Sequence, residues 1–95
     1  MKNSPPVQRF PLGSIVSTPG ALHLLTSHKV SAFVLLALHQ SGEWGDVTPD
    51  DARANDHALS VGARVLSVHI VGVNRLWIIT EADRSSTTLL LPEEY

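Results

Sequence analysis

Residues 75–92 constrain the fold more than any other stretch of the chain. Two runs rich in β-branched, aromatic and leucine residues flank a polar loop in which Asp83 is placed to start a turn. This pattern predicts a β-hairpin. Both strands of the hairpin are too apolar to face water, so the rest of the chain has to cover them.

The chain is short and almost neutral. Its 95 residues, 43% of them hydrophobic, predict one domain that buries about 60% of its unfolded surface. Seven basic against nine acidic residues disfavour both a nucleic-acid binder and an acidic mimic of DNA. The absence of cysteine excludes disulfides, thiolate metal sites and a cysteine nucleophile. No signal-peptide pattern and no apolar run of about 18 residues is present, so we expect a cytoplasmic protein without a membrane role.

The first ten residues offer little to bury. We expect residues 1–10 to form a disordered lead and residues 11–95 to form a single domain. A short strand is predicted over 13–18, where it stops because Pro19 lacks the backbone donor that a continuing strand needs.

Three helices are expected next. Thr18 and Thr48 each precede a proline, an arrangement typical of a helix N-cap followed by the first helical position. These signals predict helices from Pro19 to Ser27 or His28 and from Pro49 to about Ser60. Between them, the run from about Ser31 to Gln40 is apolar on all sides, which predicts a buried helix.

Two strands joined by Gly72-Val73 follow the third helix. Glycine at the first central position is typical of a type II′ turn, which would join strand 64–71 to the strand after it. The chain is therefore expected to be α+β, with three helices packed on an antiparallel sheet of three to four strands in the order β-α-α-α-β-β-β. Counting outward from the turn pairs Val71 with Asn74, Ile70 with Arg75, Val68 with Trp77, Leu66 with Ile79, and Arg64 with Glu81.

Both faces of this sheet are apolar. We assign the face with the larger side chains to the core, and it carries Leu66, Val68, Ile70, Trp77, Ile79 and Leu90. The second face is also too apolar for water, so either the chain itself or a partner must cover it. That second face carries Val65, Ser67, His69, Val71, Leu76, Ile78, Thr80, Leu89 and Leu91.

Candidate chemistry is sparse. The five histidines form neither an i, i+4 helical pair nor a His-x-His strand pair, so we expect no metal site, and we expect no cofactor. His39 and His57 lie near Asp46 in the sequence, and a histidine beside carboxylates can perform acid–base chemistry. The alternative is that the acidic residues of this region are helix caps and solvated loop. The hairpin loop with Asp83 and Arg84 is either a recognition tip or a self-bonded turn.

Several blocks of the chain resemble a family of roughly hundred-residue bacterial proteins of plasmids and integrative elements. These proteins are usually called plasmid-related protein, or are labelled a type I restriction subunit M from gene context. The resemblance covers the start (10–22), Gly42–Asp46, Asn55–Leu59 and above all Leu76–Tyr95. It implies a mobile-element setting and no established activity. The restriction label does not suit a chain of 95 residues without a cofactor-binding motif.

Three hypotheses remain open. The first is a non-enzymatic accessory protein of mobile DNA that binds another protein or itself, as a homodimer, through the second sheet face. The second is a counter-defence inhibitor that blocks restriction or CRISPR systems. The third is a small metal-independent nuclease. The candidate binding residues are Trp44, Asp46, Asn55, Ser67, His69, Ile78, Thr80, Asp83, Arg84 and Leu89.

Overall fold

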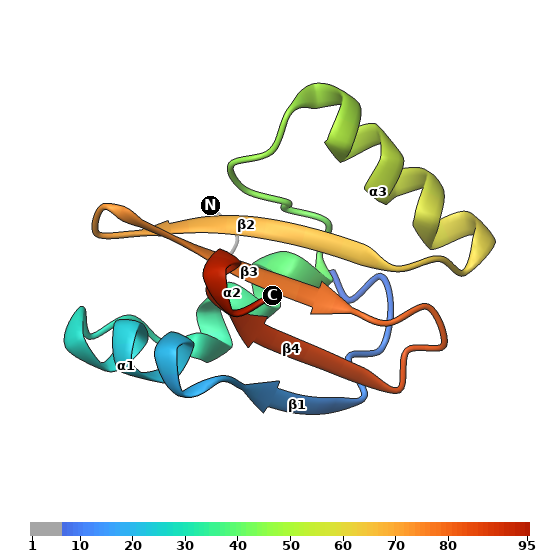
Figure 1. Ribbon diagram of the computed structural model, residues 1–95. Coiled ribbons are helices and arrows are strands. Elements are labelled where there is room, and N and C mark those ends of the chain that lie inside the picture. The colour runs from blue at the N-terminus through green and yellow to red at the C-terminus, as the bar shows by residue number, and fades with distance from the viewer. Residues whose placement is uncertain (1–6) are drawn as a thin grey trace, which may run out of the picture.

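A four-stranded sheet carries three helices in the computed structural model, which describes residues 7–95 (Figure 1). The α+β class and the element order β-α-α-α-β-β-β are confirmed. The elements are β1 (Ser14–Ser17), α1 (Pro19–Ser27), α2 (Ala32–Gln40), α3 (Pro49–Val61), β2 (Val65–Val71), β3 (Asn74–Thr80), β4 (Ser86–Leu90) and a closing 3-10 turn, η1 (Pro92–Glu94).

The helix boundaries follow the predicted capping signals. The hydroxyl oxygens of Thr18 and Thr48 accept hydrogen bonds from backbone amides of the first turns of α1 and α3. Gly62 ends α3 in the left-handed conformation, with φ of 70°. No single helix among the described residues is long and apolar enough to cross a membrane.

The sheet has the strand order β1-β4-β3-β2. Strands β2, β3 and β4 form an antiparallel meander, and the register predicted between β2 and β3 is confirmed at every pair within the two strands. Gly72 has the positive φ, 65°, that the predicted turn needs at its first central position. Arg64 and Glu81 lie 3.7 Å apart, as the register requires. Strand β1 joins the far side of the meander, parallel to β4.

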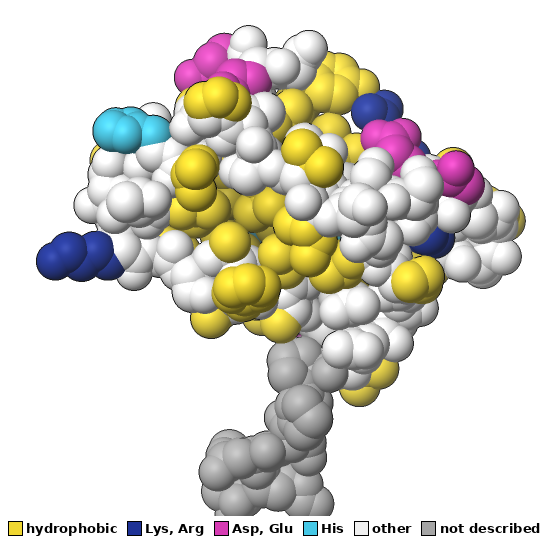
Figure 2. All heavy atoms as spheres, turned by 90° about the horizontal axis from the view of Figure 1, so that it is seen from below, with side chains coloured by type: hydrophobic (Ala, Val, Ile, Leu, Met, Phe, Trp, Pro, Cys, Tyr) yellow, Lys and Arg dark blue, Asp and Glu magenta, His cyan; other side chains and the backbone are white. Residues whose placement is uncertain are grey.

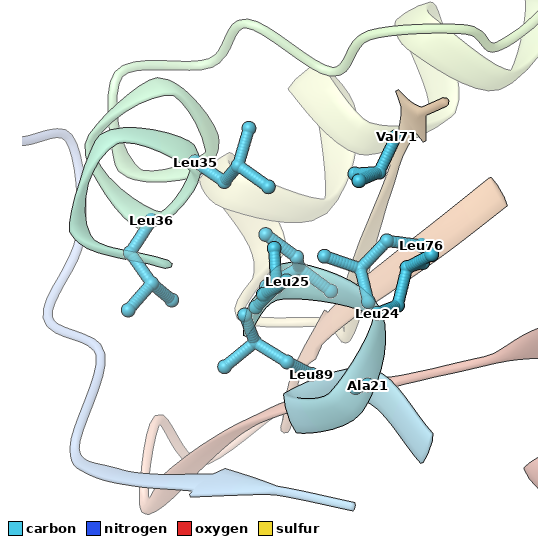
Figure 3. Close-up of a cluster of buried hydrophobic side chains, with 9 residues drawn as sticks. Ala21, Leu24, Leu25, Leu35, Leu36, Val71, Leu76 and Leu89 are labelled. Atoms are coloured by element: carbon cyan, nitrogen blue, oxygen red, sulfur yellow. The ribbon is translucent and has the colours of Figure 1, made fainter. Parts of the chain in front are cut away.

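The second sheet face is the main core, and helices α1 and α2 cover it from within the chain (Figure 3). Leu76 and Ile78 of β3 are fully buried there, and leucines of both helices point toward them. We call this the helix-side face. The core cluster consists of Ala21, Leu24, Leu25, Leu35, Leu36, Val71, Leu76, Ile78 and Leu89. Of the two predicted alternatives, internal cover is therefore correct, and a partner is not needed on this face.

The opposite face, here called the outer face, is covered only in part. Helix α3 lies along the β2 edge, while η1 lies over β3 and β4 (Figure 1). The Trp77 ring packs edge-on against Tyr95, with 5.7 Å between ring centroids. The prediction that this face is the core is wrong for Ile70, which is 53% exposed because neither α3 nor η1 reaches it.

Two further expectations are corrected by the packing. Helix α2 is not buried on all sides, because Phe33 is 79% exposed and only one side of the helix contacts the sheet. The folded part also begins before residue 11, since Phe10 is buried and stacks on Trp44. The rest of the predicted lead, residues 1–6, lies outside the described residues.

Candidate interaction surface: the open edge of the sheet

The polar residues predicted on the second sheet face form a buried chain of hydrogen bonds. His39 of α2 lies at its centre, with Nδ1 2.7 Å from the Ser67 hydroxyl and Nε2 2.8 Å from the Thr80 hydroxyl. His69 Nε2 lies 3.0 Å from Ser67 Oγ, and Thr80 Oγ1 lies 2.7 Å from Thr87 Oγ1. The chain thus runs from β2 through α2 to β3 and β4.

The direction of these bonds follows from their last member. Thr87 donates its hydroxyl hydrogen to the carbonyl of Leu12, so it accepts from Thr80, which in turn accepts from His39 Nε2–H. His39 Nδ1 then accepts from Ser67, and Ser67 accepts from His69. One neutral arrangement therefore satisfies every group in the chain.

Burial keeps both histidines neutral. It lowers the pKa of His39 from 6.5 to about 3, with smaller contributions from the positive charge that His69 would carry if protonated and from the charge of Arg84. Burial also lowers the pKa of His69. Because both nitrogens of His39 already have partners and the side chain is fully buried, this histidine cannot exchange protons directly with a substrate in solvent. The chain of hydrogen bonds has a structural role.

Three other candidate residues close the β2 edge of the sheet. The Asn55 side chain bonds to both backbone groups of Leu66, donating to its carbonyl at 2.7 Å and accepting from its amide at 3.1 Å. Two residues along, Val68 donates to the Trp44 carbonyl at 2.9 Å and accepts from the Asp46 amide at 2.7 Å. An amide side chain and a short extended segment therefore replace a neighbouring strand.

The remaining acidic and histidine candidates are not brought into one site. The Asp46 carboxylate is 3.0 Å from the Arg75 guanidinium on β3, whereas His57 points to solvent from α3. Among residues 7–95, no three or more histidine, aspartate or glutamate side chains are grouped so that they could hold a metal ion.

The hairpin loop between β3 and β4 bonds to itself and to the body of the protein. Asp83 accepts a hydrogen bond from the Ser85 amide. Hydrogen bonding by the Ser85 side chain, and next by this amide, lowers the pKa of the Asp83 carboxyl group. The Arg84 guanidinium donates to the Ala63 and Glu81 carbonyls and lies over the Phe10 ring.

The ten candidate residues thus fall into two groups. Five are buried beneath α1 and α2, namely Ser67, His69, Ile78, Thr80 and Leu89. The others brace the β2 edge or the loop between β3 and β4.

Strand β1, in contrast, leaves its outer edge open. The Ser14 and Thr18 amides donate to β4-side carbonyls, those of Ser85 and Leu89, at 3.0 Å each. The backbone amide and carbonyl groups of successive residues point to alternate sides of a strand. Those of Ile15 and Ser17 therefore point away from β4. Within residues 7–95, no hydrogen bond from outside the sheet reaches those groups. All four residues of β1 are exposed.

Apolar side chains surround this open edge. Figure 2 looks onto β1, α1 and α2 and shows hydrophobic side chains gathered between these elements, with charged side chains at the margin. Residues 10–42, which build all three elements, contain a single charged residue, Lys29. We call the exposed apolar residues the β1 surface: Ile15 (49% exposed), Val16 (50%), Leu22 (59%), Phe33 (79%) and Val34 (58%).

The sequence interpretation missed the β1 surface. Phe33 and Val34 were expected in a buried helix, and no position in the sheet was predicted for the strand before Pro19. One signal was present in the sequence, namely the near absence of charge over residues 10–42. Such a stretch indicates an exposed apolar surface without charges that would keep another chain away, in addition to a buried apolar core.

Two shallow hollows lie on the outer face. They have volumes of about 500 and 310 Å³ and share Asn55, Leu66 and Trp77 as lining residues. The arginines at their ends are already engaged, Arg75 with Asp46 and Arg64 with Glu81 and Tyr95. Apart from Asp51, which lines the larger hollow, the charged side chains of these hollows are therefore paired with other residues.

Comparisons with known proteins add no family to this picture. No protein-family model, no curated protein and no solved structure matches the chain. The function of the chain therefore has to be inferred from its geometry.

Proposed function

We propose that the protein is a non-enzymatic binding protein of the cytoplasm that docks a protein chain on the β1 surface. The observation that carries this proposal is the combination of an open strand edge with exposed Ile15, Leu22 and Phe33 beside it. The setting suggested by the family resemblance, a plasmid or an integrative element, completes the proposal.

Protein chains recognise such edges in a well-defined way. An extended segment adds a strand to the edge, and its backbone bonds to the free amide and carbonyl groups while its side chains fill adjacent apolar positions. On this protein, Ile15 and Ser17 offer the backbone groups, and residues of α1 and α2 offer the apolar contacts. Aromatic side chains often dominate the energy of such contacts, and Phe33 is the most exposed residue of the β1 surface.

The arrangement of the histidines and carboxylates supports binding over catalysis. His39 is enclosed in the core and kept neutral, and the Asp46 carboxylate is paired with Arg75. His39 and Asp46 therefore brace the fold, and the five residues of the β1 surface carry no acid, base or nucleophile.

Site-specific photocross-linking tests the proposal. Position 33 would carry p-benzoylphenylalanine, which resembles the natural phenylalanine, and the protein would be irradiated in bacterial cells of its own source. Position 73 is the matched control, because Val73 is 95% exposed and lies in the β2–β3 turn, outside the β1 surface.

We expect a discrete cross-linked species from position 33 and none from position 73. Its mass distinguishes a second copy of the chain from a different protein, and either identity supports the proposed function. A position-33 variant that gives no more cross-linking than the position-73 variant would contradict it.

A further inference from the structure

We infer that the chain docked on the β1 surface is a second copy of this protein, whose β1 pairs antiparallel with the first. This inference rests on the proposed function and names the partner. The two four-stranded sheets would then join into one continuous sheet of eight strands, with a two-fold axis at the junction.

The backbone groups of β1 are suited to pairing with themselves. In an antiparallel register that places Ile15 opposite Ser17 of the second copy, each of these residues exchanges two hydrogen bonds with its opposite. All outward-facing groups within the strand are then satisfied in both copies.

The neighbouring register is less favourable. It would place Ile15 opposite Ile15 and would require Gly13 to pair with Ser17. Gly13 has φ of 67°, which lies outside the strand region, so its amide and carbonyl cannot continue a regular ladder. The register centred on Val16 is therefore the one that the local backbone supports.

Charge also favours a second copy. A two-fold axis brings the side chains close to it near their own duplicates, so a charged strip along β1 would repel the same strip of the second copy. Lys29 is the single charged residue of the segment 10–42, and the four residues of β1 are uncharged. A strongly acidic or basic peptide would find no complementary charge on this edge, whereas an identical neutral strand matches it.

The helices add the area that a strand pair lacks. A stable interface buries roughly 800 Å² on each partner, which is more than two short strands supply. Because the two-fold axis runs perpendicular to the joined sheet, the α1 and α2 layers of both copies lie on the same side of it. The exposed Leu22, Phe33 and Val34 provide apolar surface on that side.

A single introduced cysteine tests the register directly. The chain has no cysteine, so Val16→Cys creates the only thiol. In the inferred register, residue 16 faces its own duplicate as a non-hydrogen-bonded pair with Cα atoms about 4.5 Å apart, a separation that suits a disulfide. Val73→Cys is the control, because that side chain is exposed in the β2–β3 turn.

Under mild oxidation at low protein concentration, we expect Val16→Cys to form a disulfide-linked dimer at least about tenfold faster than Val73→Cys. Equal rates for the two variants would overturn the inferred pairing.

A second pair of variants separates edge pairing from general apolar adhesion. Ser17→Pro removes an amide that points away from β4, whereas Ser17→Ala keeps it and removes only the hydroxyl. By light scattering across a concentration series, wild type and Ser17→Ala should be dimers. Ser17→Pro should weaken the dimer by about 10- to 100-fold, because each copy loses one intermolecular hydrogen bond.

The outcomes also distinguish this inference from the proposed function. A wild-type chain that stays monomeric throughout, or a Ser17→Pro variant that dimerises like wild type, would overturn the β1 pairing. If position 33 still cross-links to a different protein in that case, the proposed binding function stands. If it cross-links to nothing, both fail.

Discussion

The two edges of the sheet differ in how much of their outward backbone is bonded by other parts of the chain. At the β2 edge, the outward backbone groups of Leu66 and Val68 are bonded by Asn55 and by the Trp44–Asp46 segment. At the β1 edge, the corresponding groups of Ile15 and Ser17 have no such cover among the described residues. Natural sheets usually protect their edges, so an edge left open beside apolar side chains indicates a docking site.

Closure of the β2 edge depends on two unusual residues. Gly45 has φ of 79° and approaches the Val68 carbonyl so closely that no side chain fits between them. Asn55 comes from α3 and is buried with both ends of its amide engaged. Among residues 7–95, neither a close glycine nor an amide side chain covers the outward side of β1.

The largest effect is expected from Gly45→Ala. The new methyl group would be placed against the Val68 carbonyl oxygen in a strained backbone conformation, so we expect a loss of more than about 3 kcal/mol in the free energy of unfolding. Gly62→Ala is the matched control: its φ is also positive, 70°, but open space surrounds it, and the loss should be about 1 kcal/mol. Urea denaturation measures both values, and equal losses would show that the Gly45 approach is not what closes the edge.

The next largest effect concerns Asn55→Ala. It removes two hydrogen bonds and leaves the Leu66 amide and carbonyl without their partner, which should cost about 2–3 kcal/mol of unfolding free energy. His57→Ala, at an exposed position of the same helix, should change stability by less than about 0.5 kcal/mol. If Asn55→Ala behaves like His57→Ala, the amide does not hold the edge.

The third prediction concerns the pH dependence of stability. It tests the buried chain of hydrogen bonds around His39, which links β2 to the segment just before β1. The pKa of His39 is lowered to about 3, so below pH 6.5 the unfolded state binds a proton that the folded state does not. Stability is therefore full above pH 6.5 and falls as the pH decreases toward 3, by about 1.4 kcal/mol for each pH unit. His69, whose pKa is also lowered, adds to this slope.

Denaturation curves between pH 7.5 and 4.5 measure the slope. His39→Gln should reduce this slope by the contribution of one proton, about 1.4 kcal/mol for each pH unit. A stability that does not depend on pH in this range would contradict the neutral, enclosed state of His39.

The smallest effect on stability is expected at the β1 edge itself. Ile15→Lys places a charge on an exposed strand position, so the free energy of unfolding of the monomer should change by less than about 0.5 kcal/mol. The same substitution should abolish self-association, because each lysine would lie opposite Ser17 of the second copy and diagonal to the other lysine, where the two like charges repel each other at the apolar junction. Val73→Lys should leave both quantities unchanged. A dimer of Ile15→Lys as stable as wild type, measured by light scattering, would contradict the role of this edge.

Much of the fold could be predicted because its determinants are local. Threonine followed by proline defined the starts of α1 and α3, and the Gly72-Val73 turn determined the whole register of the β2–β3 hairpin. The alternation of residues along each strand correctly predicted which side chains share a face of the sheet.

The remaining features depend on contacts between distant residues. Both sheet faces are apolar, so the pattern alone did not show that α1 and α2 cover the face with Ile78 and Leu89. The parallel pairing of β1 with β4 joins segments some seventy residues apart in the sequence, and no turn specifies it. The open edge follows from that pairing, which is why the candidate site was assigned to buried residues.

Residue-resolved amide hydrogen exchange tests the contrast between the edges most directly. In dilute protein, the Leu66 and Val68 amides should be protected while the Ile15 and Ser17 amides exchange freely. As the concentration rises, Ile15 and Ser17 should become protected and the other two should not change. Protection of Ile15 and Ser17 in dilute monomer, or free exchange at every concentration, would contradict an open edge that closes by pairing with a second copy.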